Sequence, residues 1–215
     1  MRIILKKYFF LFAVTFFPAV VYPATPAQNS GSGIPATIGP APRILPAEKI
    51  KIAGISNAGN VDNILFRGAQ PQLAAFQRLK SLGVSIVVDL HNTGAAQSAE
   101  HEAVEALGMR YVSLPASKIY GPTDEQVAQF LTMVRQKPSA KIFVHCNLGA
   151  DRTGVMVAAY RMAQGQWTPD QAYNEMRLFH HNTFLIPMGH SVKHFPERFR
   201  TEAAFAPLRE EKTPN

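Results

Sequence analysis

The segment HCNLGADRTG, residues 145–154, holds the one cysteine of the 215-residue chain, and Arg152 lies six positions after Cys146. An apolar segment that predicts a buried strand precedes the cysteine, and a strongly apolar segment that predicts a helix follows. Gly149 allows the backbone to curl, so that successive N–H groups point inward and form an anion-binding nest. The positive N-terminal end of the following helix is directed at the same point. The segment therefore predicts a binding site for a tetrahedral anion beside a thiol.

The side chains of this loop suit phosphoryl transfer. Arg152 offers a planar guanidinium that can bind two phosphoryl oxygens at once. The positive surroundings favour the thiolate of Cys146, which is the nucleophilic form. Thr153 can donate a hydrogen bond to the sulfur and help it leave in a second step, and His145 is expected to hydrogen-bond to the backbone and hold the loop. We predict catalytic roles for Cys146 and Arg152, phosphate binding by Asn147, Leu148, Gly149, Ala150, Asp151 and Arg152, and supporting roles for His145 and Thr153.

Strand and helix patterns alternate along the chain and position this loop. Strands are predicted at 64–67, 85–90, 109–114 and 141–145. Helices are predicted from a stripe at Leu73, Phe76, Leu79 and Leu82, at 98–107, from the N-cap Thr123, at 154–163, from the N-cap Thr168 with Pro169 after it, and at 192–205 with Pro196 disturbing it. The alternation predicts an α/β fold, a single domain with a central, largely parallel sheet flanked by helices. Ligands of such sheets bind beyond the carboxyl ends of the strands, where Cys146 lies.

The loop resembles the signature H-C-x5-R-[ST] of the protein tyrosine phosphatase superfamily, and the chain is similar to its bacterial dual-specificity-like members over about residues 60–185. The segment FRGAQP, 66–71, is similar to the first conserved segment of compact members of this family. The resemblance implies a two-step mechanism, with a phosphocysteine at Cys146 that water then hydrolyses, and with no metal and no cofactor. Two alternatives are a cysteine that only fills the core, and a rhodanese-type sulfurtransferase, whose loop is typically shorter.

The proton donor is the open question in this resemblance. The family usually carries an aspartate on a mobile loop 25–40 residues before the cysteine, but the centre of the corresponding segment, 117–121, contains no carboxylate. Asp124 is the nearest candidate, although an acid in the first turn of a helix also simply complements the helix dipole. Asp151 is the other candidate, for which the resemblance implies a catalytic role. Similar loops occur in bacterial phosphatases that accept phosphoinositides, but they have a lysine where this chain has Ala150.

The expected substrate is a phosphoprotein carrying phosphotyrosine, or another small phosphate monoester. A phosphoinositide or inositol phosphate phosphatase is the alternative. A second alternative is a phosphate-binding pseudophosphatase without turnover, which the missing loop acid suggests. Four histidines, His180, His181, His190 and His194, could suggest a metal site, since His190 and His194 lie four positions apart. No carboxylate partner is evident nearby, and we expect no metal.

Composition limits the remaining possibilities. With 47% apolar and 17% charged residues, the chain can form a core, and a wholly disordered protein is excluded. A single cysteine excludes an intramolecular disulfide. A mildly basic surface suits anionic substrates. The sequence contains no basic stripe with interleaved aromatic residues, the pattern that would indicate nucleic-acid binding. We expect a monomer.

The first 27 residues have the pattern of a signal peptide, because Arg2, Lys6 and Lys7 precede a short apolar run. Removal of these three basic residues lowers the formal net charge from +7 to +4. The expected organisation is a signal peptide at 1–27, a leader rich in proline, glycine and alanine at 28–48, and a phosphatase domain at 49–215. The protein is expected in the periplasm or outside the cell, with membrane contact only through an uncleaved N-terminal segment.

Overall fold

One six-stranded sheet forms the centre of the computed structural model, which describes residues 45–92, 94–164 and 167–210. The strands are β1 (Glu48–Lys49), β2 (Gly59–Asn60), β3 (Leu65–Ala69), β4 (Val84–Asp89), β5 (Arg110–Ser113) and β6 (Lys141–Cys146). Their order is β1-β2-β3-β6-β4-β5. The neighbouring strands β3, β6, β4 and β5 pair in parallel, whereas the two short strands β1 and β2 pair antiparallel with each other and β2 with β3. The predicted largely parallel sheet is confirmed, while the predicted signal peptide and most of the predicted leader lie outside the described residues.

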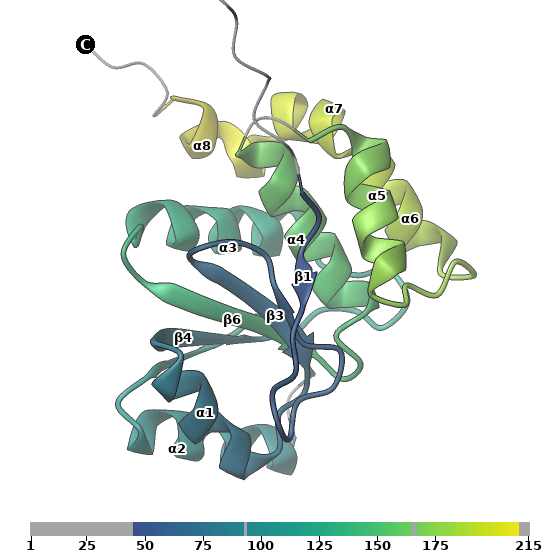
Figure 1. Cartoon of the computed structure of the whole chain (residues 1–215). Coiled ribbons are helices and arrows are strands. Elements are labelled where there is room, and N and C mark those ends of the chain that lie inside the picture. Colours follow the sequence, from purple (N-terminus) through teal and green to yellow (C-terminus); the bar gives the residue numbers. More distant parts are fainter. Residues whose placement is uncertain (1–44, 93, 165–166, 211–215) are drawn as a thin grey trace, which may run out of the picture. The chain divides into compact units, whose positions relative to one another are not determined.

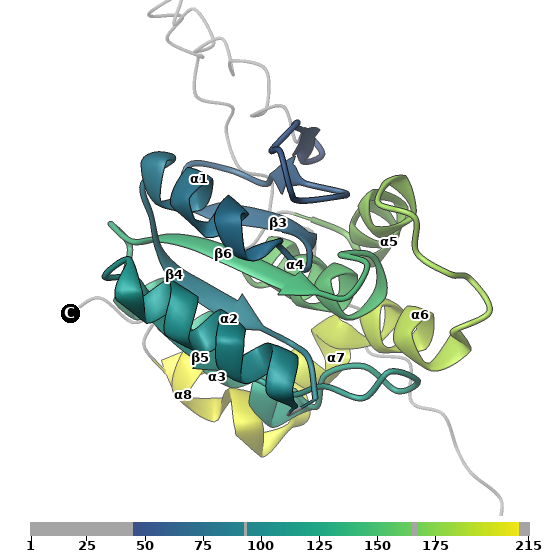
Figure 2. The ribbon, with the colours of Figure 1, turned by 90° about the horizontal axis from the view of Figure 1, so that it is seen from below.

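Helices cover both faces of the sheet. They are α1 (Phe76–Ser81), α2 (Ala95–Ala106), α3 (Asp124–Gln136), α4 (Asp151–Ala163), α5 (Pro169–Leu178), α6 (Ile186–Lys193), α7 (Phe195–Thr201) and α8 (Ala206–Glu210). Helices α1 and α2 lie on one face, and α3 and α4 lie on the other, with α5 to α7 packed outside α4 (Figures 1 and 2). Within the described ranges, no helix has the length and apolar character needed to cross a membrane.

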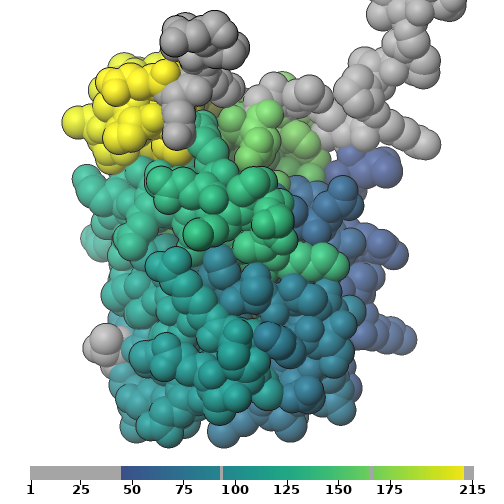
Figure 3. Space-filling view, turned by 90° about the vertical axis from the view of Figure 1, so that its left-hand side faces the viewer, coloured from purple at the N-terminus to yellow at the C-terminus, as the bar shows by residue number. Residues whose placement is uncertain are grey.

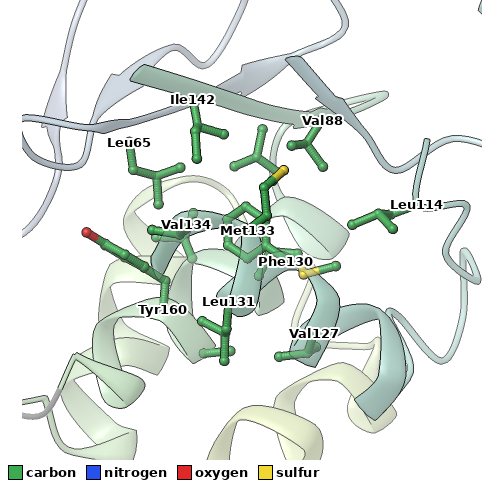
Figure 4. Packing of buried hydrophobic residues seen from close by; sticks show 14 of the residues in the cluster. Leu65, Val88, Leu114, Val127, Phe130, Leu131, Met133, Val134, Ile142 and Tyr160 are labelled. Carbon is green, nitrogen blue, oxygen red and sulfur yellow. The ribbon is translucent and has the colours of Figure 1, made fainter. Parts of the chain in front are cut away.

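The two helical layers are held by alternate residues of the central strands. Val87 and Phe143 contribute to the apolar cluster of the α1 and α2 side, whereas their neighbours Val88 and Ile142 contribute to the cluster of the α3 and α4 side. Successive side chains of a strand point to opposite faces, so a strand that is apolar at every position must be covered on both. Figure 4 shows the cluster on the α3 and α4 side, in which Phe130 of α3 lies beneath Val88 and Ile142 and is fully buried.

Local capping signals start two of the helices where they were predicted. The Thr123 hydroxyl accepts a hydrogen bond from the Gln126 N–H at 3.3 Å, and the Gln126 side chain accepts one from the Thr123 N–H at 2.9 Å. Thr168 and Gln171 repeat this capping box at the start of α5. Each box satisfies two N–H groups that the first helical turn leaves free, which explains why both boundaries could be predicted from sequence.

Two expectations about helices were wrong in detail. Leu73 and Leu82, which were predicted on a buried helical stripe, are 55% and 40% exposed, because the helix between them is only six residues long. The stretch 192–205 is divided among α6, α7 and a short 3-10 turn. The break between α6 and α7 falls at His194, and Pro196 follows it in the first turn of α7, where a missing N–H costs nothing, so the expected disturbance at Pro196 is present. The segment that follows packs against α3, and Figure 3 shows it beside the middle part of the chain.

Candidate active site

The segment from Cys146 to Arg152, here called the anion loop, joins β6 to α4 at the carboxyl end of the sheet. Gly149 adopts a left-handed conformation with φ +66°. A Cβ atom at this position would lie 2.3 Å from the carbonyl carbon of Gly68 in β3, so no side chain fits there. Glycine therefore provides both the curl of the loop and its close approach to the neighbouring strand.

Three consecutive carbonyl groups of the anion loop are held from outside. The Gln70 N–H donates to Asn147 O at 3.3 Å, the Asn57 Nδ2 donates to Leu148 O at 3.1 Å, and the Arg67 Nη2 donates to Gly149 O at 2.8 Å. In a trans peptide the N–H points away from the C=O. Because these carbonyls face the braces, the N–H groups of residues 148–150 are directed to the other side, where they can bind an anion.

A cavity of about 350 Å³ lies at the anion loop. The anion loop contributes Cys146, Asn147, Leu148, Asp151 and Arg152 to its lining. The structure therefore brings the three predicted catalytic residues together at one cavity. Gly149 and Ala150 belong to the same loop, and Ala150 is buried behind it.

Three segments distant in sequence complete the cavity wall, with Gln70 after β3, His91 after β4, and Lys118 in the loop between β5 and α3. Lys118 occupies the segment in which the family pattern would place a carboxylate. From this loop the cavity wall thus receives a lysine and no carboxylate, as the sequence of residues 117–121 led us to expect.

Arg152 is held rather than free, because its Nη1 donates to the carbonyl oxygen of Leu90 at 2.8 Å. The residue is only 5% exposed, yet it lines the cavity. A guanidinium has further N–H donors that remain for a ligand. The bond to the end of β4 thus fixes the direction of the planar group, which suits binding of phosphoryl oxygens.

A second guanidinium, that of Arg67, lies beneath the loop and is fully buried. It stacks on the ring of Phe179 at 3.9 Å from the ring centre. Burial lowers the pKa of Arg67, while the charges of Glu175 and Cys146 raise it, and the pKa of about 10 leaves the group cationic at neutral pH. Attraction between two charges is mutual, so this buried cation stabilises negative charge on the Cys146 sulfur.

Behind the cysteine, His145 is fully buried and differs from expectation in its partner. Its Nε2 lies 2.7 Å from Oε1 of Glu100, a buried carboxylate of α2, rather than at a backbone group. The position of His145 next to Cys146 still places it where it can support the loop. The hydroxyl of Thr153 is buried and has no hydrogen-bond partner among the described residues, so it is available to the sulfur.

The buried Asp89 pairs with the partly buried His91, which lines the cavity. The His91 Nδ1 lies 2.6 Å from Oδ1 of Asp89, and the Tyr111 hydroxyl donates to Oδ2 at 2.7 Å. Burial alone would raise the pKa of Asp89, but these hydrogen bonds and the nearby His145 outweigh it and lower the pKa to about 2. Burial and the bond to Asp89 raise the pKa of Tyr111.

In the described ranges, one group of side chains has the spacing of a metal ligand set, namely Asp89, His91 and His145, whose ligand atoms lie within 4.8 Å of one another. Their contacts with each other, with Tyr111 and with Glu100 already account for that proximity. His190 and His194, which suggested a metal site in the sequence, stack their rings at 4.0 Å.

The two candidate proton donors have different surroundings. Asp124 does not line the cavity, and its carboxylate pairs with Arg198 of α7. Asp151 lines the cavity, and its Oδ1 accepts hydrogen bonds from His181 and from the N–H of Asn182. A catalytic role of Asp151 remains a prediction at this point, but its position is compatible with one.

Sequence reasoning did not assign roles to Asn57, Arg67 and His181, which contact the anion loop or its first helical residue. Arg67 belongs to the segment FRGAQP, whose resemblance to family members was a usable signal. Asn57 and His181 stand in segments without a motif, so only the folded structure reveals their contacts.

Comparison with known proteins agrees with this geometry. The family model described as "DSP-PTPase phosphatase fused to NAD+ Kinase" matches residues 47–187. The chain belongs to this family. It is 25% identical over 162 residues to dual specificity protein phosphatase 26 of Rattus norvegicus, a match that covers 71% of this chain and 76% of the relative. The protein is therefore a hydrolase of the protein-tyrosine and dual-specificity phosphatase class.

Solved structures show the same fold. TpbA of P. aeruginosa superposes with a TM-score of 0.59 at 21% identity, covering 77% of this chain and 95% of TpbA. The catalytic domain of the PP-IP phosphatase SIW14 of S. cerevisiae superposes with a TM-score of 0.59 at 17% identity, covering 73% of this chain and 98% of that domain. At these identities the similarity concerns the fold and not the substrate.

Proposed function

We propose that the protein hydrolyses phosphate monoesters through a phosphocysteine at Cys146, with phosphotyrosine in a protein as the preferred substrate and dual-specificity action as a variant of it. The observation that carries this proposal is the meeting of Cys146, Arg152 and other residues of the anion loop at one cavity. A thiolate beneath a cradle for three phosphoryl oxygens is arranged for in-line attack on phosphorus.

The residues act in two steps. The Cys146 sulfur attacks phosphorus while the loop N–H groups and Arg152 hold the equatorial oxygens, and the P–O bond to the leaving group breaks. Water then attacks the phosphocysteine, and the P–S bond breaks with its electron pair on sulfur. The unpartnered Thr153 hydroxyl can donate to the departing thiolate, and the buried Arg67 stabilises its charge. No step needs a cofactor.

The surroundings of the cavity favour an aryl phosphate. Leu148 lines the cavity and is 64% exposed, and Ile119 and Tyr120, which follow Lys118, are 58% and 70% exposed. Large exposed apolar side chains at the mouth of a binding site favour a partner with apolar surface of its own. A phosphotyrosine ring meets that requirement. A TpbA variant has been crystallised in complex with phosphotyrosine.

An inositol phosphate or phosphoinositide substrate is the second candidate, and Lys118 is the observation in its favour, because it adds a cation beside Arg152. The solved neighbour SIW14 is a PP-IP phosphatase. An inositol carrying several phosphates needs several cations, whereas the cavity wall as described has one lysine and one arginine. We therefore place this candidate second.

A substrate panel tests the proposal. Phosphotyrosine, phosphoserine and phosphothreonine peptides, an activated aryl phosphate, nucleotides and inositol phosphates are offered to the wild-type protein and to Cys146→Ser, with vanadate as an inhibitor. We expect the highest kcat/KM on phosphotyrosine, inhibition by vanadate, and background rates for Cys146→Ser. Robust turnover by Cys146→Ser would refute the phosphocysteine mechanism. Tight phosphopeptide binding without turnover even of the aryl phosphate would identify a pseudophosphatase.

We also propose export, cleavage near residue 27 and a monomeric mature protein. The pattern of the first 27 residues supports export. N-terminal sequencing of the protein from the periplasm or medium, and its size in solution, test these points. A protein found only in the cytosol with an intact N-terminus would contradict them.

A further inference from the structure

The carboxylate of Asp151 accepts hydrogen bonds from a segment about thirty residues further along the chain. The Nδ1 of His181 lies 2.7 Å from Oδ1 of Asp151, and the N–H of Asn182 donates to the same oxygen at 2.8 Å. Asp151 is the first residue of α4 and lines the cavity beside Arg152. Residues that follow the C-terminal end of α5 therefore contact a side chain of the cavity wall.

His181 is placed by the way α5 ends. His180 adopts a left-handed conformation with φ 66°, its N–H donates to Arg177 O, and the N–H of His181 donates to Met176 O. This pair of bonds is a Schellman motif, which fixes the backbone after a helix. The imidazole of His181 thus projects from a rigid turn rather than from a loose loop.

The ring of His181 is also confined. Its side chain is fully buried, and the edge of the Tyr173 ring lies against it at 5.7 Å between ring centres. Its Nε2 is buried without a hydrogen-bond partner in the described part of the chain. The one polar contact that the ring makes there is the one to Asp151, so burial of the ring favours keeping that contact.

The two oxygens of Asp151 are consequently different. Oδ1 accepts both hydrogen bonds, whereas Oδ2 accepts none from the described residues and is not among the buried unpartnered atoms. Since Asp151 lines the cavity, Oδ2 is the oxygen that is left for a ligand or for water. Burial alone would raise the pKa of Asp151, but the bonds from His181 and Asn182 outweigh it and lower the pKa, which favours the carboxylate.

Two other buried carboxylates near the loop, Asp89 and Glu100, already have partners of their own. Asp89 accepts from His91 and Tyr111, and Glu100 contacts His145. Neither lines the cavity. In the described ranges, Asp151 is the acidic side chain of the cavity wall.

We propose that His181 is the positioning residue of the active site: it holds Asp151 so that Oδ2 faces the cavity, where this oxygen accepts a proton from the water that hydrolyses the phosphocysteine. The inference rests on the proposed function. In this step the water oxygen bonds to phosphorus, one water proton passes to Oδ2, and the P–S bond breaks with its electron pair on the Cys146 sulfur. Asp151 then releases this proton to bulk water, in keeping with its lowered pKa.

Three variants test the role of His181. His181→Leu removes the donor and keeps an apolar side chain in the pocket. His181→Asn removes the imidazole but keeps an N–H at the place of Nδ1. His180→Asn is the matched control, because it changes the neighbouring residue at an exposed position, and asparagine tolerates the left-handed conformation. Thermal unfolding of each variant reports whether the fold is retained.

The readout is rapid-quench kinetics on an activated aryl phosphate, which needs little help from an acid in the first step. We expect His181→Leu to lower kcat by about 10- to 100-fold, part of the 10²–10⁴ typical of acid–base catalysis, and to release a burst of about one product per site. His181→Asn should stay within about 3-fold of the wild type, and His180→Asn should be unchanged. In an Asp151→Asn background, His181→Leu should have little further effect, because the two residues act as one unit.

Wild-type kcat in His181→Leu, an equal loss in His181→Asn, or an undiminished loss in the Asp151→Asn background would overturn the positioning role. These outcomes leave the phosphatase mechanism intact, since the wild type still turns over and Cys146→Ser does not. A wild-type protein that forms no phosphocysteine at all would overturn the proposed function and this inference with it.

Discussion

Substitution of Gly149 by alanine is the sharpest test of the anion loop. The new Cβ would lie 2.3 Å from the carbonyl carbon of Gly68, whereas carbon atoms in contact are about 3.5 Å apart. The loop or β3 must therefore shift by about 1 Å. A misplacement of about 1 Å costs on the order of 100-fold in rate. We expect Gly149→Ala to lower kcat/KM on an aryl phosphate by about this factor.

Gly108 supplies a matched control for this experiment. Its φ is also +66°, but the nearest atom to a Cβ there is Lys80 Nζ at 3.9 Å. Gly108→Ala thus carries the backbone strain of about 1–2 kcal/mol without the clash. For a protein of this size each 1 kcal/mol lowers Tm by about 2–4 °C, and kcat/KM should be unchanged. Near-wild-type activity of Gly149→Ala, or an equal activity loss in Gly108→Ala, would refute the reasoning.

Three further predictions follow from the site. The depressed pKa of Asp89, from 3.8 to about 2, contributes about 2 kcal/mol of stability that is present above about pH 4 and lost as the pH falls towards 2. Urea unfolding of Asp89→Asn should show the full deficit at pH 7 and about a third of it at pH 2.5, and a constant deficit would contradict this. Asp124→Asn should keep wild-type turnover and its pH profile, because Asp124 contacts Arg198 outside the cavity. Peroxide should inactivate the enzyme through Cys146, with recovery by dithiothreitol after mild exposure only, and insensitivity at millimolar peroxide would argue against a thiolate.

What could be predicted from the sequence was what contiguous residues determine. The capping boxes of Thr123 and Thr168 involve partners three positions away, so their helices begin where the pattern indicates. The anion loop is likewise one uninterrupted segment, and the alternation of apolar strands and helices was enough for the sheet type. The fold class and the grouping of Cys146, Asp151 and Arg152 follow from such local signals.

What could not be predicted depends on contacts between distant segments. His181 reaches Asp151 across thirty residues, and its role is invisible without the turn that ends α5. The partner of His145 comes from α2, a helix whose sequence gives no sign that Glu100 is buried.

The braces on the anion loop also limit how far its chemistry can be moved. Ten neighbouring residues include the nucleophile and the guanidinium, yet the oxygens of Leu148 and Gly149 are tied by Asn57 and Arg67, which precede them by 91 and 82 positions. Transplanting residues 145–154 onto another strand–helix junction would transfer the reactive groups without the hydrogen bonds that hold the loop in its conformation. A functional transplant must also include residues 57–70, which donate these hydrogen bonds.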